Sequence, residues 1–130
     1  MNIKKTAYLL LNFAIKRLAE IFGIITFISG TMLLVALITY SPEDPNFIFP
    51  ENTEIKNLLG FQGSYISDLL FQSLGIIAYL ISFTLMITGI NIFRIKEFFL
   101  IIENIFFATL YCIFGTLFLT FFILKVSLFT

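Results

Sequence analysis

The sequence predicts an all-α integral membrane protein: a helical bundle with three transmembrane helices, preceded by an N-terminal helix lying on the membrane surface. Hydrophobic residues make up 59% of the chain and charged residues 12%, whereas soluble domains average about 45 to 50% and about 25%. Long stretches also carry no charge, and a bilayer core about 30 Å thick takes about 20 apolar helical residues. Such stretches must be helical, because lipid offers no hydrogen-bond partner to backbone N–H and C=O groups and a helix pairs these groups internally.

Three windows have the required length. Residues 21–40 hold 20 residues without charge, residues 69–93 hold 25, and residues 98–124 hold 27 with Glu103 as the single charge. We therefore expect two parts, an amphipathic cytoplasmic segment at 1–20 and a transmembrane domain at 21–130, whose first two spans are joined by an outer loop at 41–68.

The first 20 residues resemble a secretion signal only superficially. Lys4 and Lys5 precede an apolar run, but Asn12 and Lys16 interrupt it too early and no small-residue cleavage pattern follows. Lys5, Asn12 and Lys16 can share one face of a helix, which favours a helix on the membrane surface. A frayed tail is the alternative.

The distribution of cations predicts the orientation. Residues 1–20 carry four cations, whereas the segment 41–68 carries only Lys56 against five acids, and the connection after the second span carries Arg94 and Lys96. By the positive-inside rule, the N-terminus and the 94–97 turn are cytoplasmic and the acidic segment is outside. Three spans then place the C-terminus outside.

The segment SPEDP follows the first window directly. Pro42 and Pro45 cannot extend a helical hydrogen-bond ladder, and each restricts the residue before it. Ser41 and Asp44 can fold their side chains onto nearby backbone amides, which favours a tight turn. The first helix is therefore expected to end here.

The approach to the second window contains glycines and capping residues. Gly60 and Gly63 permit a turn or a close backbone approach, and Ser64 and Ser67 could cap the second membrane helix. Asp68 lies near the expected N-terminus of that helix, where the dipole stabilises a carboxylate. It could serve as a cap or make a specific contact with another helix or a partner.

Small and polar residues then recur along one face of the second window. Gln72 follows Asp68 by one turn, and Gly75, Ala78 and Ser82 continue the stripe. This composition is expected of a membrane helix packed against another helix.

The third window has a seam of small residues at every fourth position: Ala108, Cys112, Thr116 and Thr120. Such a seam can serve packing within the chain or contact between subunits.

Glu103 is the one acid well inside a window, and an intramembrane acid is a functional candidate. It could reach the interface beside Arg94 and Lys96, or act in gating or proton transfer. The second role would suit an alternative function, a small three-span transporter or channel subunit.

Several functions are excluded by residues that the chain lacks. It has no histidine and a single cysteine, so nucleophilic triads and common zinc sites are ruled out. No glycine begins the phosphate-binding pattern G-x-x-x-x-G-K-[ST]. Net charge is zero, which offers no basic face for nucleic acid. We expect no catalytic, metal or cofactor site and no direct binding of nucleic acid.

The motifs described above resemble those of the N-terminal membrane domain of the FtsK/SpoIIIE family of DNA translocases. That domain shows S-P-x-D-P after its first span, then N-x-x-G-x-x-G-x-x-x-x-D, then an aromatic residue, a glycine and an A-Y pair. The matching residues here are Ser41, Pro42, Asp44 and Pro45; Asn57, Gly60, Gly63 and Asp68; and Phe71, Gly75, Ala78 and Tyr79.

The resemblance covers residues 33–89 and implies a membrane anchor in the bacterial cytoplasmic membrane at the division septum. It implies partners as well: the lipid bilayer, further copies of the chain and other division-site membrane proteins. Two departures stand out. Ser82 replaces a proline that is frequent in the family, and three spans are predicted where the family usually has four or more. The family's cytoplasmic ATPase motor is absent from this sequence.

Overall fold

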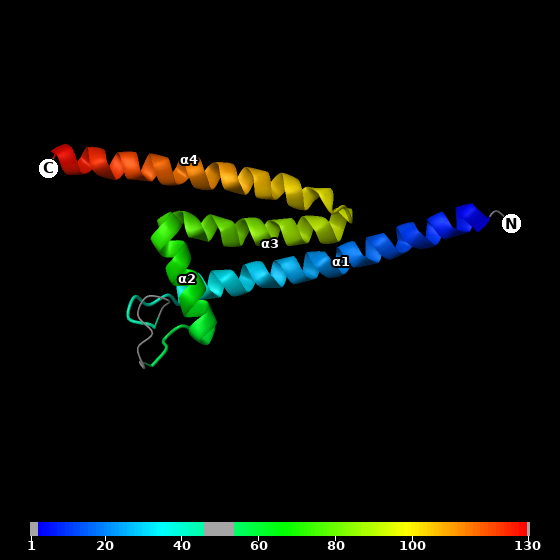
Figure 1. The fold of residues 1–130 in the computed structure, drawn as a ribbon, viewed down its shortest axis with the longest axis horizontal. Coiled ribbons are helices and arrows are strands. Elements are labelled where there is room, and N and C mark those ends of the chain that lie inside the picture. Colours follow the sequence, from blue (N-terminus) through cyan, green and yellow to red (C-terminus); the bar gives the residue numbers. More distant parts are fainter. Residues whose placement is uncertain (1–2, 46–53, 130) are drawn as a thin grey trace.

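The computed structural model describes residues 3–45 and 54–129, and within them the chain is helical without strands. Four α-helices and one short 3₁₀ helix follow in order (Figure 1): α1 (Ile3–Ile38), α2 (Gly60–Leu74), η1 (Gly75–Ile77), α3 (Ala78–Ile95) and α4 (Phe99–Phe129). Three stretches are long and apolar enough to cross a membrane, namely Lys4–Ile38, Gly60–Ile95 and Phe99–Ser127. The predicted all-α membrane fold is confirmed.

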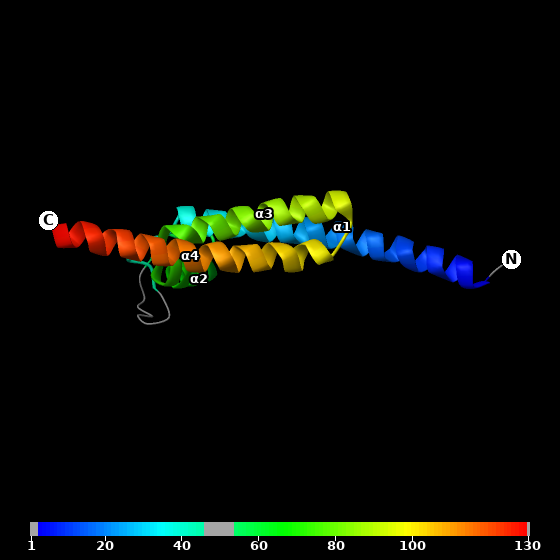
Figure 2. The same cartoon turned by 90° about the horizontal axis from the view of Figure 1, so that it is seen from above.

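The helices α1, α3 and α4 run along a common direction, whereas α2 crosses it (Figures 1 and 2). The first half of α1 continues beyond the α3–α4 turn, and the last part of α4 continues past α2 at the opposite end. We call these two ends of the bundle the turn end and the junction end.

The N-terminal segment is helical but is not a separate helix. α1 runs without interruption from Ile3 to Ile38, so the expected boundary at residue 20 is not a helix end. The reason lies in the sequence: the described part of this segment has no glycine before Gly23 and no proline, the residues that usually break a helix. Its placement on a membrane surface stays a prediction.

The second apolar stretch becomes helical earlier than predicted and is broken into two helices. The expected outer loop 41–68 already contains the start of α2 at Gly60, and the expected span 69–93 is broken at Gly75. Gly75 ends α2, because its backbone φ of 60° lies outside the right-handed helical region. Glycine suits this position, since the conformation is unfavourable for residues with a Cβ atom. The part aligned with α1 is α3, whose 18 residues span about 27 Å.

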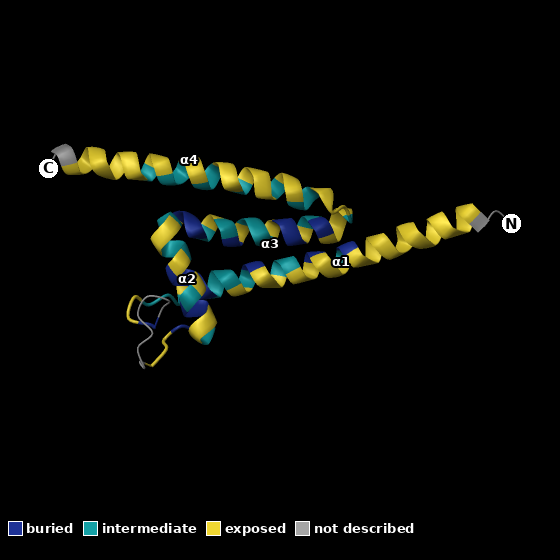
Figure 3. Cartoon of the chain, viewed as in Figure 1, coloured by how far each residue is buried: buried dark blue, intermediate teal, exposed yellow. Residues whose placement is uncertain are grey.

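Glycines bring α1 and α3 into backbone contact. A Cβ atom added at Gly89 would lie 2.5 Å from the backbone nitrogen of Phe27, and one at Gly23 would lie 2.7 Å from that of Phe93. Gly30 similarly faces the backbone of Met86. Ala78 and Ser82, predicted as packing residues, are fully buried on α3. Small residues allow membrane helices to approach this closely, and buried residues gather along this pair and at α2 (Figure 3).

The contact of α4 with the bundle is much looser. Ala108, Cys112 and Thr116 are half-buried on its inner side, whereas Thr120 is exposed. Two side chains of α4 bond to α3: Asn104 Nδ2 donates to Thr88 Oγ1 at 2.9 Å, and the Tyr111 hydroxyl donates to the Leu80 carbonyl at 3.1 Å. The predicted seam therefore packs within the chain over most of its length.

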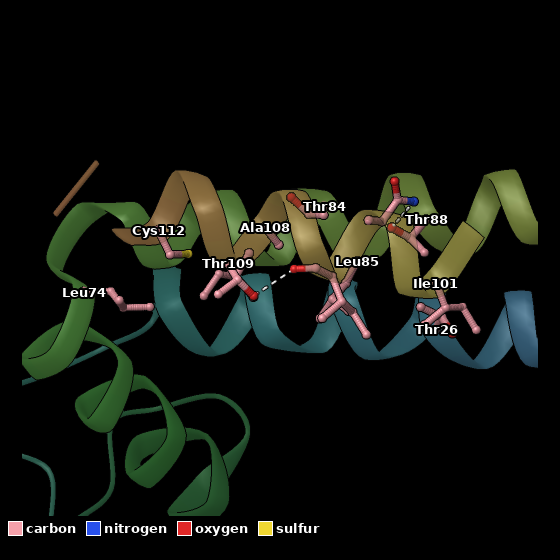
Figure 4. A pocket seen from close by; sticks show the side chains of 12 residues that line it. Thr26, Leu74, Thr84, Leu85, Thr88, Ile101, Ala108, Thr109 and Cys112 are labelled. Carbon is pink, nitrogen blue, oxygen red and sulfur yellow. Dashed lines mark hydrogen bonds between the residues drawn. The ribbon is translucent and has the colours of Figure 1, made fainter. Parts of the chain in front are cut away.

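Helices α1, α3 and α4 enclose an open groove of about 400 Å³ (Figure 4). Half of its lining residues are aliphatic, and Thr84, Thr88 and Thr109 project from α3 and α4 towards it. The Thr84 and Thr109 hydroxyls bond to helix carbonyls, while Thr88 accepts from Asn104. These polar groups are thus already occupied by partners inside the protein.

Candidate functional site

The last turn of α1 is capped by side chains that come from elsewhere in the chain. Asn57 Nδ2 donates to the carbonyl oxygens of Ala36 at 2.9 Å and Thr39 at 3.4 Å, and the Tyr79 hydroxyl donates to that of Leu37 at 3.1 Å. The final carbonyls of a helix have no partner inside it. Asn57 and Tyr79 therefore satisfy groups that would otherwise be costly to bury.

The SPEDP turn is held by the Asp44 carboxylate. Its two oxygens accept from the backbone N–H groups of Lys56 and Asn57, each at 2.9 Å, and the residue is 4% exposed. Ser41 Oγ accepts from the Glu43 amide at 3.4 Å. The predicted helix end and the local bond of Ser41 are confirmed. Asp44, expected to bond nearby, instead bonds to amides 12 and 13 residues ahead.

Ser64 and Ser67 do not cap a helix, contrary to the sequence prediction. α2 begins at Gly60, which places both serines inside the helix. Ser64 Oγ donates to the Pro45 carbonyl at 3.0 Å, so it ties α2 to the SPEDP turn. Ser67 Oγ donates to the Ser64 carbonyl at 3.0 Å.

Asp68 contacts the segment that follows α1, but not a residue of that helix. Its Oδ1 accepts from the Tyr40 hydroxyl at 3.0 Å and its Oδ2 from Gln72 Nε2 at 2.8 Å. The Tyr40 ring also lies 4.7 Å from that of Phe71, which contacts Tyr79 at 5.6 Å between centroids. Asp68 is not a cap, because the helix starts eight residues earlier, at Gly60.

An ion pair lies at the exposed rim of the same region. Lys56 Nζ bonds to Glu43 Oε2. The hydrogen bond and the positive charge of Lys56 lower the pKa of the Glu43 carboxyl, and Glu43 raises the pKa of Lys56. Both side chains are mostly exposed, so the pair contributes little to stability.

The three motif glycines have different roles. Gly63 is a close approach, because an added Cβ atom would lie 2.3 Å from Asn57 Oδ1. Gly60 has a φ of 66° with open space around it and serves as a turn. Gly75 also has open space within 4 Å. The predicted packing role of Gly75 is therefore wrong, and its role is to let the chain turn between α2 and α3.

These contacts define one site at the junction end of the bundle, which we call the polar junction: Thr39, Tyr40, Ser41, Asp44, Pro45, Asn57, Gly60, Gly63, Ser64, Asp68 and Tyr79. Eight of the twelve motif residues belong to it; of the others, Phe71 packs against Tyr40 and Tyr79, and Ala78 is buried on α3. Pro42 is exposed beside it, and Gly75 lies beyond it. Sequence reasoning missed Thr39, whose Oγ1 accepts from the Leu58 amide at 3.3 Å.

Charged residues at the turn end form a smaller cluster. Glu20 binds Arg17 and Lys96, each at 2.6 Å, and so links α1 to the α3–α4 turn. The expected association of Glu103 with Arg94 and Lys96 is absent from the described ion pairs, and Glu103 is exposed on α4. Spacing alone could not indicate that Lys96 turns towards α1.

The polar junction has the properties of a structural clasp. Every buried side-chain nitrogen or oxygen in the described residues has a hydrogen-bond partner. No group of histidine, cysteine, aspartate and glutamate in those residues could hold a metal ion. The carboxylates of Asp44 and Asp68 are engaged by donors of the chain itself.

Comparison with known proteins identifies relatives of this membrane region. Residues 15–128 match the family described as the 4TM region of DNA translocase FtsK/SpoIIIE. A DNA translocase FtsK from Caulobacter vibrioides is 40% identical over 69 residues, which cover 53% of this chain and 8% of that protein. The DNA translocase FtsK of Azospirillum brasilense is 37% identical over 79 residues, 59% of this chain and 12% of that protein.

The chain thus matches only about a tenth of the length of these relatives. No solved structure shows a significant match. The family match covers most of the chain, including both ends of the bundle and the whole polar junction, and on this basis the chain belongs to the 4TM family of FtsK/SpoIIIE DNA translocases.

Proposed function

We propose that this chain is the membrane-anchoring and septum-targeting domain of an FtsK-like translocase that acts in cell division and chromosome segregation. The observation that carries the proposal is the convergence of the family motif on the polar junction, where Asp44 and Pro45 are bonded to Lys56, Asn57 and Ser64. A preorganised surface built from these hydrogen-bonded residues suits recognition by other proteins, which a simple tether would not require. Pumping of DNA is assigned to a motor that this chain does not include.

The proposed orientation places the N-terminus and the turn end in the cytoplasm and the polar junction outside. It is supported by the four cations of residues 1–20 and by Arg94 and Lys96 at the turn end. A Glu54→Cys chain on a Cys112→Ser background should react with an impermeant reagent in intact cells. Labelling only after permeabilisation would contradict the proposed orientation and indicate the opposite one.

Localisation tests the proposed function directly. The chain with a fluorescent tag on its N-terminus should collect at the division site, and Asp68→Ala should weaken that enrichment. Ile87→Ala is the matched control, because Ile87 is 58% exposed on α3 and lies outside the junction. Membrane fractionation verifies insertion of each variant. An even membrane signal from the inserted, unmutated chain would contradict septal targeting.

Self-association and contacts with division-site membrane proteins belong to the same proposal. The outer side of α4 supports self-association, because Phe118 is 68% exposed there and could contact a second copy of the chain. A Phe118→Cys, Cys112→Ser chain in native membranes should form disulfide-linked dimers on oxidation. Monomers alone would argue against self-association through this side of α4.

A further inference from the structure

The burial pattern of α2 is the reverse of that in a helix on a soluble protein. Its buried residues are small or polar, namely Gly63, Ser64, Ser67 and Asp68, while Phe61, Ile66 and Leu69 are 50%, 44% and 58% exposed. A surface helix in water turns its apolar side to the core. Gln62, Gln72 and Ser73 are exposed as well, but Gln72 donates to Asp68 and Ser73 donates to the Leu69 carbonyl. The exposed side of α2 therefore carries no charge and suits the edge of an apolar medium, and the one charged residue of the helix, Asp68, faces inwards.

The helix α4 indicates how far that medium extends. Gly115 lies at the level of η1, because a Cβ atom added there would contact Ile77 Cδ1. From Gly115 the uncharged apolar run continues to Leu124, which adds about 14 Å of helix at 1.5 Å per residue. A helix is about 10 Å thick, and α4 continues past α2 (Figure 1). An apolar layer that covers α4 therefore also reaches α2.

The bilayer thickness gives the same result from the turn end. A core of about 30 Å corresponds to about 20 helical residues, so a core that starts at Phe99 ends close to Phe118. This level lies beyond Gly115, on the side of α2.

A groove between α1 and α2 also bears on the position of the bilayer. A groove of about 360 Å³ separates the flank of α1 from the underside of α2, and its lining includes Ser29, Met32, Leu33, Leu59, Gln62 and Ile66. The α1 part of this lining belongs to the membrane-spanning stretch Lys4–Ile38. Within a bilayer, a groove at this place opens to lipid.

We propose that α2 lies in the bilayer, across the direction of the spans, with Phe61, Ile66 and Leu69 among the acyl chains next to the headgroups. Its polar face bonds to the segment that follows α1, through Ser64 to Pro45 and Asp68 to Tyr40, and an acyl chain occupies the groove beneath it. The membrane domain thus presents an embedded crossing helix on the junction side, in place of a loop exposed to water.

Tryptophan fluorescence tests the depth of α2, because the chain has no tryptophan of its own. Single Ile66→Trp and Leu69→Trp chains are reconstituted in phosphatidylcholine vesicles, with or without bromine on the acyl chains near the headgroup. Ile87→Trp on α3 serves as the membrane-embedded reference and Ile55→Trp, before α2, as the water-exposed one. All four positions are exposed in the protein, so the larger side chain displaces no core residue.

Brominated lipid should quench Ile66→Trp and Leu69→Trp at least half as strongly as it quenches Ile87→Trp, and aqueous acrylamide should quench them less than Ile55→Trp. Strong acrylamide quenching without quenching by lipid would overturn the proposal. Protection from both quenchers would overturn it as well, since a second copy or another protein would then cover α2.

Discussion

α3 and α4 are neighbouring apolar helices of the same bundle, yet only α3 is firmly packed. Gly89 brings the backbone of α3 against that of α1, and Tyr79 bonds to the end of α1. On α4, by contrast, Phe118 and Phe121 are 68% and 70% exposed. Lipid tails are as apolar as these side chains, so hydrophobicity does not drive helix association in a bilayer. Small residues and hydrogen bonds hold the bundle together.

The largest effect is expected where the two backbones touch. A Gly89→Leu side chain would meet backbone atoms of Phe27 at 2.5 Å, which cannot move without separating the helices. We expect a loss of about 3 kcal/mol or more, at the upper end of overpacking costs. Thermal unfolding in detergent, followed by circular dichroism, measures the change.

Gly115→Leu is the matched control on α4. Its Cβ atom would meet only the end of the Ile77 side chain, which can rotate away. Equal losses for the two variants would mean that α4 is packed as firmly as α3.

The second effect concerns hydrogen bonds. Asn57→Ala removes the donor to Ala36 and Thr39 and the acceptor for the Leu59 amide at 3.0 Å. Buried groups left without a partner cost about 1 to 3 kcal/mol. Asn104→Ala on α4 removes one inter-helix bond to Thr88, for which about 0.6 kcal/mol is typical. Amide exchange in the last turn of α1 should rise only in the Asn57 variant.

The third effect separates backbone conformation from packing at Gly75. Since its φ is 60° and no atom lies within 4 Å of an added Cβ, Gly75→Ala and Gly75→Leu should destabilise the protein equally. Strain of this kind costs about 1 to 3 kcal/mol. A much larger loss for leucine in chemical unfolding would restore the packing role expected from the sequence.

The smallest effect is the pH dependence of the exposed Glu43–Lys56 pair. Because Lys56 holds the pKa of Glu43 below its usual value of 4.5, the folded state is favoured above that value. This contribution is lost as pH falls through the lowered pKa. Lys56→Met should remove the dependence and return the Glu43 pKa towards 4.5, as measured by NMR titration. An unchanged pKa would show that the pair does not persist in solution.

The fold class, the three apolar stretches and the end of α1 could be predicted from the sequence, because these features depend on local properties. Span length is set by bilayer thickness, and the prolines of SPEDP exclude helix whatever surrounds them. The motif also indicated most of the polar junction, since buried polar residues next to an apolar run need partners.

Which residues contact one another depends on the three-dimensional arrangement of the helices. Asp44 could reach its distant amides, and Asp68 could reach Tyr40, only once the chain had turned back on itself. Gly75 and Gly89 are the same residue type in the same apolar region, but one turns the chain and the other admits a neighbouring helix. Spacing cannot separate these roles, because the first depends on the backbone φ and the second on the position of α1.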